Sequence, residues 1–344
     1  MIRRSRALAT AALATALLVA AGCSDDSGSD AGADTGSSGT PDKITYVTAF
    51  GAAGRDAFAW VAKEKGYFKE ANLEVDIQLG KATGENIKTL KAGAADFVNL
   101  DMMGGFITEG KLETAPEMKT ILAVHQQTLV SIISLEGYNV TGPKDLEGKT
   151  IAAATASVNQ LLFPAYAKLA GIDEKKVTWK DAQPTQLAGL LAQHQVDALS
   201  TFLIGKTGIE NAAGGKKAVV LPYGNYLTDL YGNGIFTSNE TAKNKPELVK
   251  RFRDAMLKAL QYTLDNPDEA AQILKTAQPA ANVAAAKGEI VSMTPYTKPT
   301  SGAPLGSIDT QRAARAIALL ESLNLIKAGV KPEDLVATDL IVKA

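Results

Sequence analysis

The feature that most constrains the fold is a strand–loop–helix–strand unit in residues 73–101. Apolar residues at strand spacing begin at Val75, Gly80 interrupts them, and Ile87 and Leu90 resume at helical spacing. A strand that leads through a glycine-containing loop into a helix and then a second strand is typical of parallel α/β structure.

The same plan returns in residues 177–202, with a turn at Gln183-Pro184 between the first strand and the helix. Asp96 in the first unit and Asp197 in the second stand at matching places, just before the second strand. Two such units predict an α/β protein with two lobes. The loops at the carboxyl ends of the strands are expected to face a shared crevice.

The composition is that of a soluble globular protein, with 46% hydrophobic and 21% charged residues in a chain of 344. This length is sufficient for two domains with their own cores. Residues 1–22 contain three arginines and no acidic residue, so the rest of the chain has 33 basic and 37 acidic residues, a net charge of −4. A mildly acidic chain without a basic stripe is not expected to bind nucleic acid.

Residues 1–22 are predicted to be a signal peptide, because Arg3, Arg4 and Arg6 precede an apolar run at 7–21. The run is too short and too rich in Ala and Thr for a comfortable membrane span. The rest of the chain contains no second apolar run of that kind, so we expect the protein to reach the membrane only through an anchor.

The sequence LVAAGC at residues 18–23 resembles the lipobox of bacterial lipoproteins, in which the cysteine receives acyl chains such as palmitate and becomes the first residue. Ala20 stands where leucine is commonest. We expect Cys23 to be lipidated and residues 23–42 to form a flexible tether, which gives an extracytoplasmic protein anchored to the bacterial cell membrane. The alternative is an ordinary secreted protein whose lone cysteine follows the cleavage site.

The body of the protein is predicted to divide at two crossings between the lobes. We assign residues 43–127 and 223–344 to lobe 1 and residues 128–222 to lobe 2. The chain is expected to cross within an extended segment at 121–137 and to return near 216–225. The helical region that follows the return is expected to pack on the outside of lobe 1.

Four short motifs in this order resemble one family of substrate-binding proteins of ABC importers. Members of the family bind alkanesulfonates, taurine, nitrate, riboflavin or the pyrimidine precursor of thiamine, and the resemblance covers nearly all of residues 43–300. The motifs are KGYFKEANLEVDI at 65–77, LKAGAADF at 90–97, DLEGKTIA at 145–152 and QVDA at 195–198.

The resemblance implies a two-lobed type II periplasmic-binding-protein fold that closes on its ligand like a Venus flytrap. It also implies a small-molecule ligand in the cleft between the lobes, delivery to a membrane permease with its ATPase, and no catalysis. We expect a monomer with no cofactor and no metal site.

Ligands in this architecture meet the loops at strand ends and the first turns of helices, so the candidate contacts are the side chains predicted there. These residues are Phe50, Phe58, Thr83, Gly84, Asn99, Asp101, His125, Thr155, Ser157, Asn159, Gln183, Phe202, Tyr231 and Asn233.

Several of these residues have an ordinary structural alternative. Phe58 has the helical spacing of a core side chain. Thr83 and Gly84 stand at a helix start, where free backbone N–H groups suit a polar ligand atom but also a simple cap. Asp101 is either an acceptor for a ligand amine or hydroxyl, or the cap of the next helix.

His125 lies with Gln126 and Gln127 in the first crossing, in an otherwise apolar segment. Buried polar side chains need partners, so either a ligand or an internal hydrogen-bond network must satisfy them. The second histidine, His194, is expected to be exposed.

The aromatic and amide side chains favour a flat heteroaromatic ligand, such as a thiamine pyrimidine precursor or a riboflavin-like ring. Phe50, Phe202 and Tyr231 are predicted to stack on it from several sides. A sulfonate, taurine or nitrate ligand is the alternative, held by helix starts and Arg55.

Other classes of function have less support. A pyrimidine-synthesising enzyme with this fold uses a cysteine-rich iron site, whereas Cys23 is the only cysteine in this chain. The sequence has no zinc-ligand cluster, nucleophile elbow or phosphate-binding glycine motif. A lipoprotein that presents its ligand to a signalling receptor remains an alternative.

Overall fold

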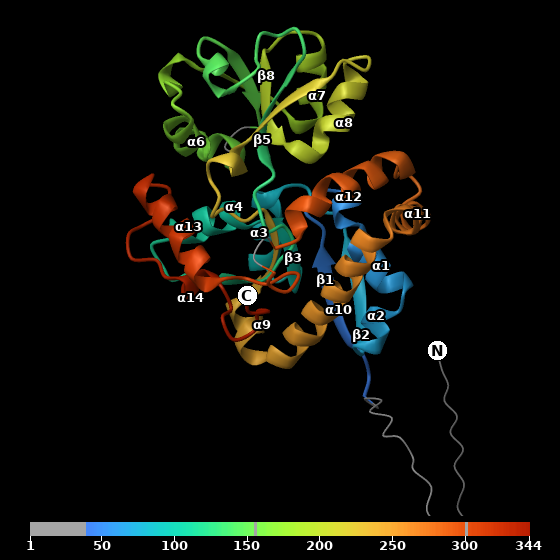
Figure 1. Ribbon diagram of the computed structural model, residues 1–344. Helices are drawn as coiled ribbons and strands as arrows, with labels where there is room; N and C mark the ends of the chain where they lie inside the picture. Colours follow the sequence, from blue (N-terminus) through green and yellow to red (C-terminus); the bar gives the residue numbers. More distant parts are fainter. Residues whose placement is uncertain (1–38, 155–156, 300–301) are drawn as a thin grey trace, which may run out of the picture. The chain divides into compact units, whose positions relative to one another are not determined.

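The computed structural model describes residues 39–154, 157–299 and 302–344 (Figure 1). The predicted signal peptide, Cys23 and Thr155 lie outside these residues. Within the described part of the chain, the helices are all too short or too polar to cross a membrane.

The first sheet contains strands from both ends of the chain. Its spatial order is β2-β1-β3-β10-β4, and β10 is antiparallel to both neighbours, while β1 is parallel to β2 and β3. The strands are β1 (Asp42–Val47), β2 (Leu73–Gln78), β3 (Phe97–Asp101), β4 (Met118–Ala123) and β10 (Asn233–Ser238).

The second sheet repeats this topology with the middle of the chain. Its order is β7-β6-β8-β5-β9, β6 is parallel to β7 and β8, and β5 is antiparallel to β8 and β9. The two-lobed α/β class is therefore confirmed. The strands are β5 (Val130–Leu135), β6 (Thr150–Ala153), β7 (Thr178–Asp181), β8 (Ala198–Phe202) and β9 (Ala218–Pro222).

The two matching aspartates have the same structural role in the two sheets. Asp96 precedes β3, and its Oδ2 accepts a hydrogen bond from the backbone N of Thr45 at 2.8 Å. Asp197 precedes β8, and its Oδ2 accepts from the backbone N of Thr150 at 2.8 Å. Each carboxylate thus joins the end of its unit to the strand that precedes the unit in the chain, β1 in the first sheet and β6 in the second.

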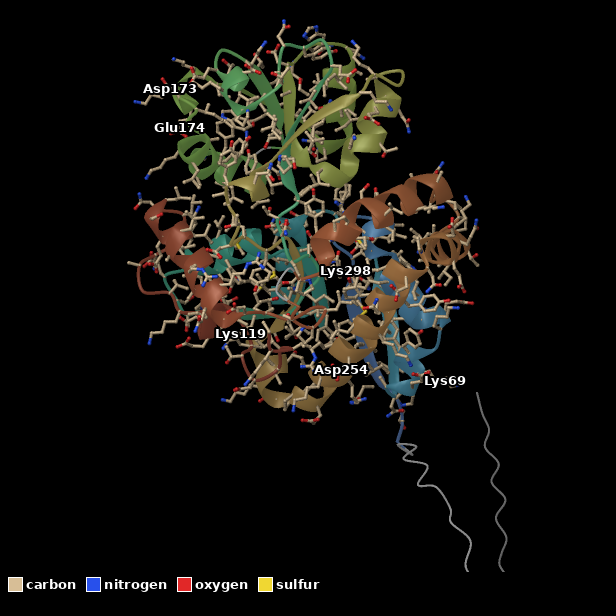
Figure 2. All side chains as sticks on the ribbon, viewed as in Figure 1. Lys69, Lys119, Asp173, Glu174, Asp254 and Lys298 are labelled. Atoms are coloured by element: carbon tan, nitrogen blue, oxygen red, sulfur yellow. The ribbon has the colours of Figure 1, made fainter. Side chains whose placement is uncertain are left out.

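Helices cover both sheets. The charged side chains labelled in Figure 2, such as Lys69, Asp173 and Asp254, are exposed on their outer surfaces. The α-helices are α1 (Ala57–Glu64), α2 (Tyr67–Glu70), α3 (Thr83–Lys91), α4 (Met102–Gly110), α5 (Val158–Leu161), α6 (Phe163–Ala170), α7 (Pro184–Ala192), α8 (Lys206–Ala212), α9 (Asn239–Asn244), α10 (Pro246–Asp265), α11 (Pro267–Ala277), α12 (Val283–Thr297), α13 (Thr310–Ser322) and α14 (Pro332–Leu335). The 3₁₀ turns are η1 (Gly54–Asp56), η2 (Pro143–Leu146), η3 (Glu174–Lys176), η4 (Leu203–Gly205) and η5 (Tyr223–Asn225).

The long helix α10 belongs to the core of the first lobe. The ring of Phe252 is stacked on those of Phe97 and Phe68, with centroid distances of 4.0 and 6.0 Å. The helix α12 contacts η1 of the first lobe and also η4 and α8 of the second. A helix from the end of the chain therefore touches both lobes beside the loop that follows β1.

The two connections between the sheets are hydrogen-bonded to each other. Between β4 and β5, the backbone N atoms of Val124 and His125 both donate to the carbonyl of Asn233 at the start of β10, at 2.8 and 3.0 Å. The backbone N of Gly232 donates in return to the carbonyl of His125. A Cβ on Gly232 would lie 2.8 Å from the Gln127 carbonyl oxygen, so this position requires glycine.

The segment predicted as one extended crossing at 121–137 is two strands with a non-strand connection between them. β4 ends at Ala123 in the first sheet, and β5 begins at Val130 in the second. The predicted divisions after Gln127 and Pro222 fall in the first connection and at the end of β9, where the second connection begins.

Two glycines near the carboxyl ends of β1 and β2 provide a matched test of this packing. A Cβ on Gly80 would lie 1.8 Å from the Thr48 carbonyl oxygen, whereas a Cβ on Gly84 in α3 would meet open space. We expect Gly80→Ala to lower the free energy of unfolding by about 1–3 kcal/mol. Gly84→Ala should be neutral or stabilising by up to about 1 kcal/mol, because alanine favours helix.

The measurement is urea unfolding of both variants without ligand. Each protein is produced as residues 24–344. Equal stabilities of the two variants would contradict the close approach at Gly80.

Candidate ligand-binding site

A buried asparagine joins the carboxyl ends of β1 and β3. The Nδ2 of Asn86 in α3 donates to the carbonyl oxygens of Thr48 and Asn99, each at 2.9 Å. Asn86 therefore fixes the loop after β1 beside the end of β3. This is the place where the doubly wound architecture puts a ligand.

Behind this loop lies a buried polar cluster around Asp56. Its Oδ1 accepts hydrogen bonds from the backbone N of Ala49 at 3.0 Å and from Nδ2 of Asn99 at 2.8 Å. Burial raises the pKa of the Asp56 carboxyl, although the neighbouring Arg55 opposes this shift. Among the described residues, Asp56 Oδ2, Asn99 Oδ1 and the hydroxyl of Tyr46 have no hydrogen-bond partner.

Asp101 caps α4 and still has one unused oxygen. Its Oδ1 accepts from the backbone N of Gly104 at 2.9 Å, so the capping role is real. Its Oδ2 is buried and finds no hydrogen-bond partner within the described chain. Burial raises the pKa of Asp101 to about 7. The capping alternative for Asp101 is therefore confirmed, and its contact with a ligand stays a prediction.

His125 likewise uses one nitrogen for the structure and leaves the other unused. Its Nδ1 accepts from the backbone N of Asn233 at 3.2 Å, so the proton of the neutral ring is on Nε2. This Nε2 is buried and lacks a partner in the part of the chain described. Burial, assisted by the charge of Arg55, lowers the pKa of His125 to about 3. The ring is therefore a neutral N–H donor at physiological pH.

Arg55 connects the two lobes. Its guanidinium carbon lies 5.8 Å from the ring centroid of Phe50, after β1, and 6.0 Å from that of Phe202, at the end of β8. Its backbone N donates to Oε2 of Glu289 on α12 at 3.3 Å. Burial raises the pKa of Glu289. Phe50 is 41% exposed, a high exposure for a phenylalanine.

The second lobe supplies two further unused polar groups after β6. Ser157 precedes α5 as its N-cap residue without forming a side-chain cap, and its buried Oγ has no partner among the described residues. The Nδ2 of Asn159 is also buried and, within the described ranges, unpartnered. The carbonyl of Asn159 accepts from the hydroxyl of Tyr223, whose ring is stacked on Tyr166 with a centroid distance of 4.3 Å.

The chemistry of this set suits a ligand that has both N–H donors and acceptor atoms. Among the described residues, the unused acceptors are Asp56, Asn99 and Asp101, the unused donors are His125, Asn159 and Arg55, and the hydroxyls of Tyr46 and Ser157 can serve as either. Leaving a buried polar group unpaired costs about 1–3 kcal/mol, and a ligand that pairs it recovers that free energy.

Charge leads to the same preference. Arg55 is the one cation of the cluster, and it is matched by the carboxyls of Asp56 and Glu289. A free anion would meet these carboxyls, so the site is better suited to a neutral or cationic ligand. Within the described residues, the structure contains no group of three His, Cys, Asp or Glu side chains that could hold a metal ion.

Two predicted aromatic contacts are corrected by the structure. Phe58 is fully buried in the hydrophobic core of the first lobe, as its helical spacing also allowed. Tyr231 is buried with its ring centroid 4.0 Å from the guanidinium carbon of Arg312, and its hydroxyl accepts from the backbone N of Asp309. The rings of Phe50 and Phe202 flank Arg55, so the structure divides the three rings predicted to share one ligand.

The remaining predicted residues lie at element ends. Thr83 and Gly84 begin α3, where Thr83 is half-buried and Gly84 is exposed. Gln183 is exposed and caps α7, its backbone N donating to Oε1 of Gln186. Asn233 is buried, and its backbone carbonyl accepts hydrogen bonds from the backbone N atoms of Val124 and His125. His194 is exposed, as expected, and its ring is stacked on Tyr138.

Several residues of the cluster could not be recognised from local sequence patterns. Tyr46 and Asp56 fit strand and helix patterns, and Glu289 lies in a small-residue helix far along the chain. Arg55 was considered only as an anion ligand. Asp56 could have been identified, because it directly precedes an apolar helix and an acidic side chain is costly to bury unless it has a role.

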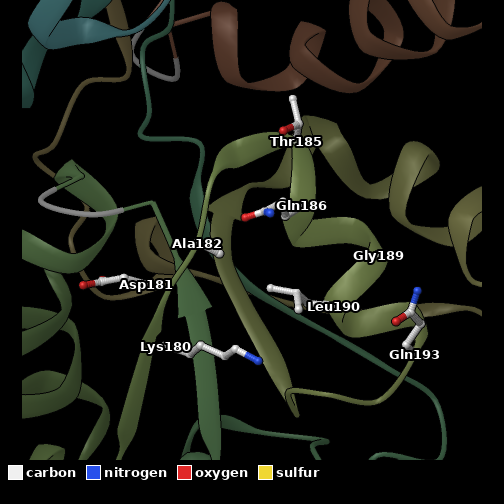
Figure 3. A pocket seen from close by; sticks show the side chains of 8 residues that line it. All are labelled: Lys180, Asp181, Ala182, Thr185, Gln186, Gly189, Leu190 and Gln193. Atoms are coloured by element: carbon white, nitrogen blue, oxygen red, sulfur yellow. The ribbon is translucent and has the colours of Figure 1, made fainter.

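Two surface hollows lie elsewhere. One, of about 480 Å³, is formed by Lys180 and Asp181 of β7 and by side chains of α7 including Gln186 and Leu190 (Figure 3). The other, of about 290 Å³, lies beside the connections and is lined by Tyr231 and Arg312 among others. The first is open and its polar side chains are exposed. Neither contains the buried unpartnered atoms described above.

The fold is that of periplasmic solute-binding proteins. The nitrate-binding protein NrtA of Synechocystis PCC 6803 matches with a TM-score of 0.70 and 13% identity over 87% of each chain. The aliphatic sulphonate-binding protein SsuA of Escherichia coli matches with a TM-score of 0.68 and 14% identity over 86% of this chain and 92% of that one. At such identities the likeness shows the fold alone.

A family model described as NMT1/THI5 like matches residues 56–270, and the chain belongs to this family. It is 24% identical over 282 residues to a formylaminopyrimidine-binding protein of Halalkalibacterium halodurans, which covers 80% of this chain and 84% of that protein. It is 26% identical over 216 residues to the riboflavin-binding protein RibY of Chloroflexus aurantiacus. This match covers 61% of this chain and 59% of that protein. The resemblance found in the motifs is confirmed, as is the expectation of a binding protein rather than an enzyme.

Asp101 predicts a pH dependence that can be isolated. The folded protein retains a proton on Asp101 up to about pH 7, whereas the unfolded chain releases it near its ordinary value of 3.8. The contribution of this group to stability is therefore present below about pH 4 and is lost as the pH rises to about 7. Asp101→Asn keeps an acceptor for the cap but does not titrate.

We expect wild type to lose about 1–3 kcal/mol more than Asp101→Asn between pH 5 and pH 8 in urea unfolding. Asp56, Glu289 and His125 titrate in both proteins, so the difference reports on Asp101. Parallel pH profiles would show that the carboxyl is ionised in the folded protein.

Proposed function

We propose that this protein is the extracytoplasmic solute-binding component of an ABC importer and that its ligand is a small flat heteroaromatic molecule. The observation that carries the proposal is the pair of rings, Phe50 and Phe202, brought from different lobes to one cation. Beside them are buried acceptors and donors without partners among the described residues. Aromatic faces suit a flat ring, and unused hydrogen-bonding groups suit its edge.

The named relatives support a heteroaromatic ligand. One binds formylaminopyrimidine and another binds riboflavin, and both molecules have planar nitrogen heterocycles. An aminopyrimidine offers amino N–H donors, which suit Asp101 and Asn99, and ring nitrogens, which suit a donor such as His125 Nε2. The thiamine pyrimidine precursor is therefore the first candidate, and a riboflavin-like ring is the second.

A sulfonate, taurine or nitrate ligand has less support from the site. The structural neighbours NrtA and SsuA share the fold at 13% and 14% identity, which says nothing of the ligand. The cation available to an anion, Arg55, is already flanked by the carboxyls of Asp56 and Glu289. A role as ligand-presenting protein for a signalling receptor would use the same site and differs only in the partner.

Capture is proposed to occur by closure about the paired connections. Because backbone hydrogen bonds join Val124 and His125 to Asn233, the two connections bend as one unit. Phe50 and the acceptors of β3 belong to one lobe, whereas Phe202 and Asn159 belong to the other. A ligand that touches both sets stabilises the closed form, and the permease with its ATPase then accepts that form.

The proposal is tested by thermal unfolding of the chain from residue 24 with two ligand panels. One contains thiamine pyrimidines, thiamine and riboflavin, and the other contains alkanesulfonates, taurine and nitrate. A ligand at a hundred times its Kd adds about 2.7 kcal/mol of stability, which raises Tm by several degrees. We expect a hit in the heterocycle panel that is lost in Phe50→Ala and in Phe202→Ala.

Leu169→Ala is the matched control, because Leu169 is 53% exposed on α6. It should retain the ligand-induced shift. Hits confined to the anion panel would contradict the heteroaromatic proposal and favour the sulfonate or nitrate alternative.

We further propose that the protein is held at the membrane through acylated Cys23 and acts as a monomer. The supporting observation is the LVAAGC motif, followed by a polar segment without large apolar residues. The periplasmic or membrane-surface location of such binding proteins agrees with an anchor of this kind.

Acylation is tested by metabolic labelling with an alkyne analogue of palmitate in a bacterial host. The wild-type chain should incorporate the label and sediment with membranes, and Cys23→Ser should do neither. Labelling that persists in Cys23→Ser would contradict the assignment of the anchor. Equal release of both proteins into the medium would indicate an ordinary secreted protein.

A further inference from the structure

The side chain of Arg55 occupies the position between the lobes where a ligand ring would be stacked. Its guanidinium carbon lies within 6.0 Å of the ring centroids of both Phe50 and Phe202. The guanidinium is planar, and planar cations bind to aromatic faces. The two rings that the proposed function assigns to the ligand thus already contact a flat group that belongs to the protein.

Arg55 is held there with few specific bonds. Its buried Nε donates no hydrogen bond to any residue of the described chain, and it lies 3.8 Å from Oδ2 of Asp56, beyond hydrogen-bond distance. The bond to Glu289 comes from the backbone N of Arg55 and not from its side chain. A guanidinium in a permanent structural role normally uses several of its five donors. Arg55 is half-buried, and its displacement would break the 3.8 Å ion pair with Asp56 but no hydrogen bond from Nε.

The surroundings of the guanidinium define what can replace it. Two aromatic rings require a planar group, and the unpartnered oxygens of Asp56 and of Asn99, which is hydrogen-bonded to Asp56, require N–H donors. The carboxyls near Arg55 compensate positive charge and repel negative charge. An amidine-like N–C–N edge is planar and carries N–H donors, as the guanidinium does. An amidinium also has the positive charge, whereas the related edge of an aminopyrimidine is neutral and meets the first two requirements.

We propose that Arg55 is an internal occupant of the ligand slot and that the ligand is a planar group with an amidine-like N–C–N edge, which must displace it. This inference rests on the proposed function and adds two properties to it. The occupied slot lowers the apparent affinity for every ligand, because only the molecules in which Arg55 has moved out can bind. The charges that hold Arg55 then select against planar anions.

The test uses three planar probes of one size that differ in charge: benzamidine, benzamide and benzoate. Their Kd values are measured by calorimetry on wild type, Arg55→Gln and Arg55→Lys. Each protein is produced as residues 24–344. In wild type we expect benzamidine to bind tightest and benzoate weakest. If Arg55 fills the slot in about nine of ten molecules, Arg55→Gln lowers the Kd of neutral benzamide about tenfold.

Benzamide is the decisive probe, because its affinity reports the vacated slot without a change in ligand–protein charge attraction. Lys63→Gln is the control: Lys63 is exposed on α1, and its substitution makes the same change in net charge. It should leave the three Kd values within about twofold. Arg55→Lys keeps the charge without the planar group, and we expect an intermediate Kd for benzamide. If Arg55→Gln does not fold, the Kd of benzamide for Arg55→Lys is used for the test in its place.

Three outcomes would overturn the inference. They are weaker benzamide binding in both Arg55 variants, benzoate binding that depends on Arg55, and no binding of benzamide to any of the proteins. Failure of the proposed function can be distinguished from failure of this inference. If the heterocycle panel does not bind wild type while Arg55→Gln lowers the Kd of benzamide, the proposed ligand class is wrong but Arg55 occupies the slot. If the panel binds and Arg55→Gln weakens it, Arg55 is a ligand contact and the internal occupant is rejected.

Discussion

The hydrogen bonds between the two connections are the constraint on which the rest of the structure depends. The carbonyl of Asn233 accepts from both Val124 and His125, and Gly232 returns a bond to His125. Arg312 adds hydrogen bonds from α13 to carbonyl oxygens of both connections, including those of Gln126 and Leu230. Because the chain passes between the two sheets here, this small region helps to set which strand ends face each other. The same region orients His125, whose Nδ1 accepts from the backbone N of Asn233 while its Nε2 has no partner among the described residues.

The polar groups around the strand ends show a conflict between stability and binding. Buried atoms such as Asp101 Oδ2 and Asn159 Nδ2 lower stability while they lack partners among the described residues. The protein retains them beside a well-satisfied framework: Asn86 has three acceptors, and Asp96 and Asp197 each fix a strand. A site whose unused atoms come from both lobes gains most when the lobes approach a shared ligand. In the proposed function, a ligand that pairs these atoms recovers the lost free energy and so favours closure.

Much of the fold could be predicted because its signals are local. Alternating apolar residues placed β2 within residues 73–78, and helical spacing placed α3 and α7, since side-chain burial follows the period of each element. The site was harder. Candidates at strand ends, such as Asn99, Asp101 and Ser157, followed from the rule that ligands meet carboxyl ends of strands. Tyr231 could not be assigned correctly, because its partner Arg312 is 81 positions away and nothing near Tyr231 indicates a cation. Glu289 was missed for the same reason.

The class of the protein follows from local features of the chain: two repeated α/β units, the matching aspartates and the motifs that resemble the NMT1/THI5-like family. These are properties of short segments, and short-range periodicity and turn chemistry encode them. Only the tertiary structure decided that Phe50 and Phe202 meet at Arg55, that His125 keeps a free N–H, and that α12 brings Glu289 to the loop after β1. These relations join residues far apart in the chain. They depend on how the two sheets pack about the connections, and no local pattern of residues records that packing.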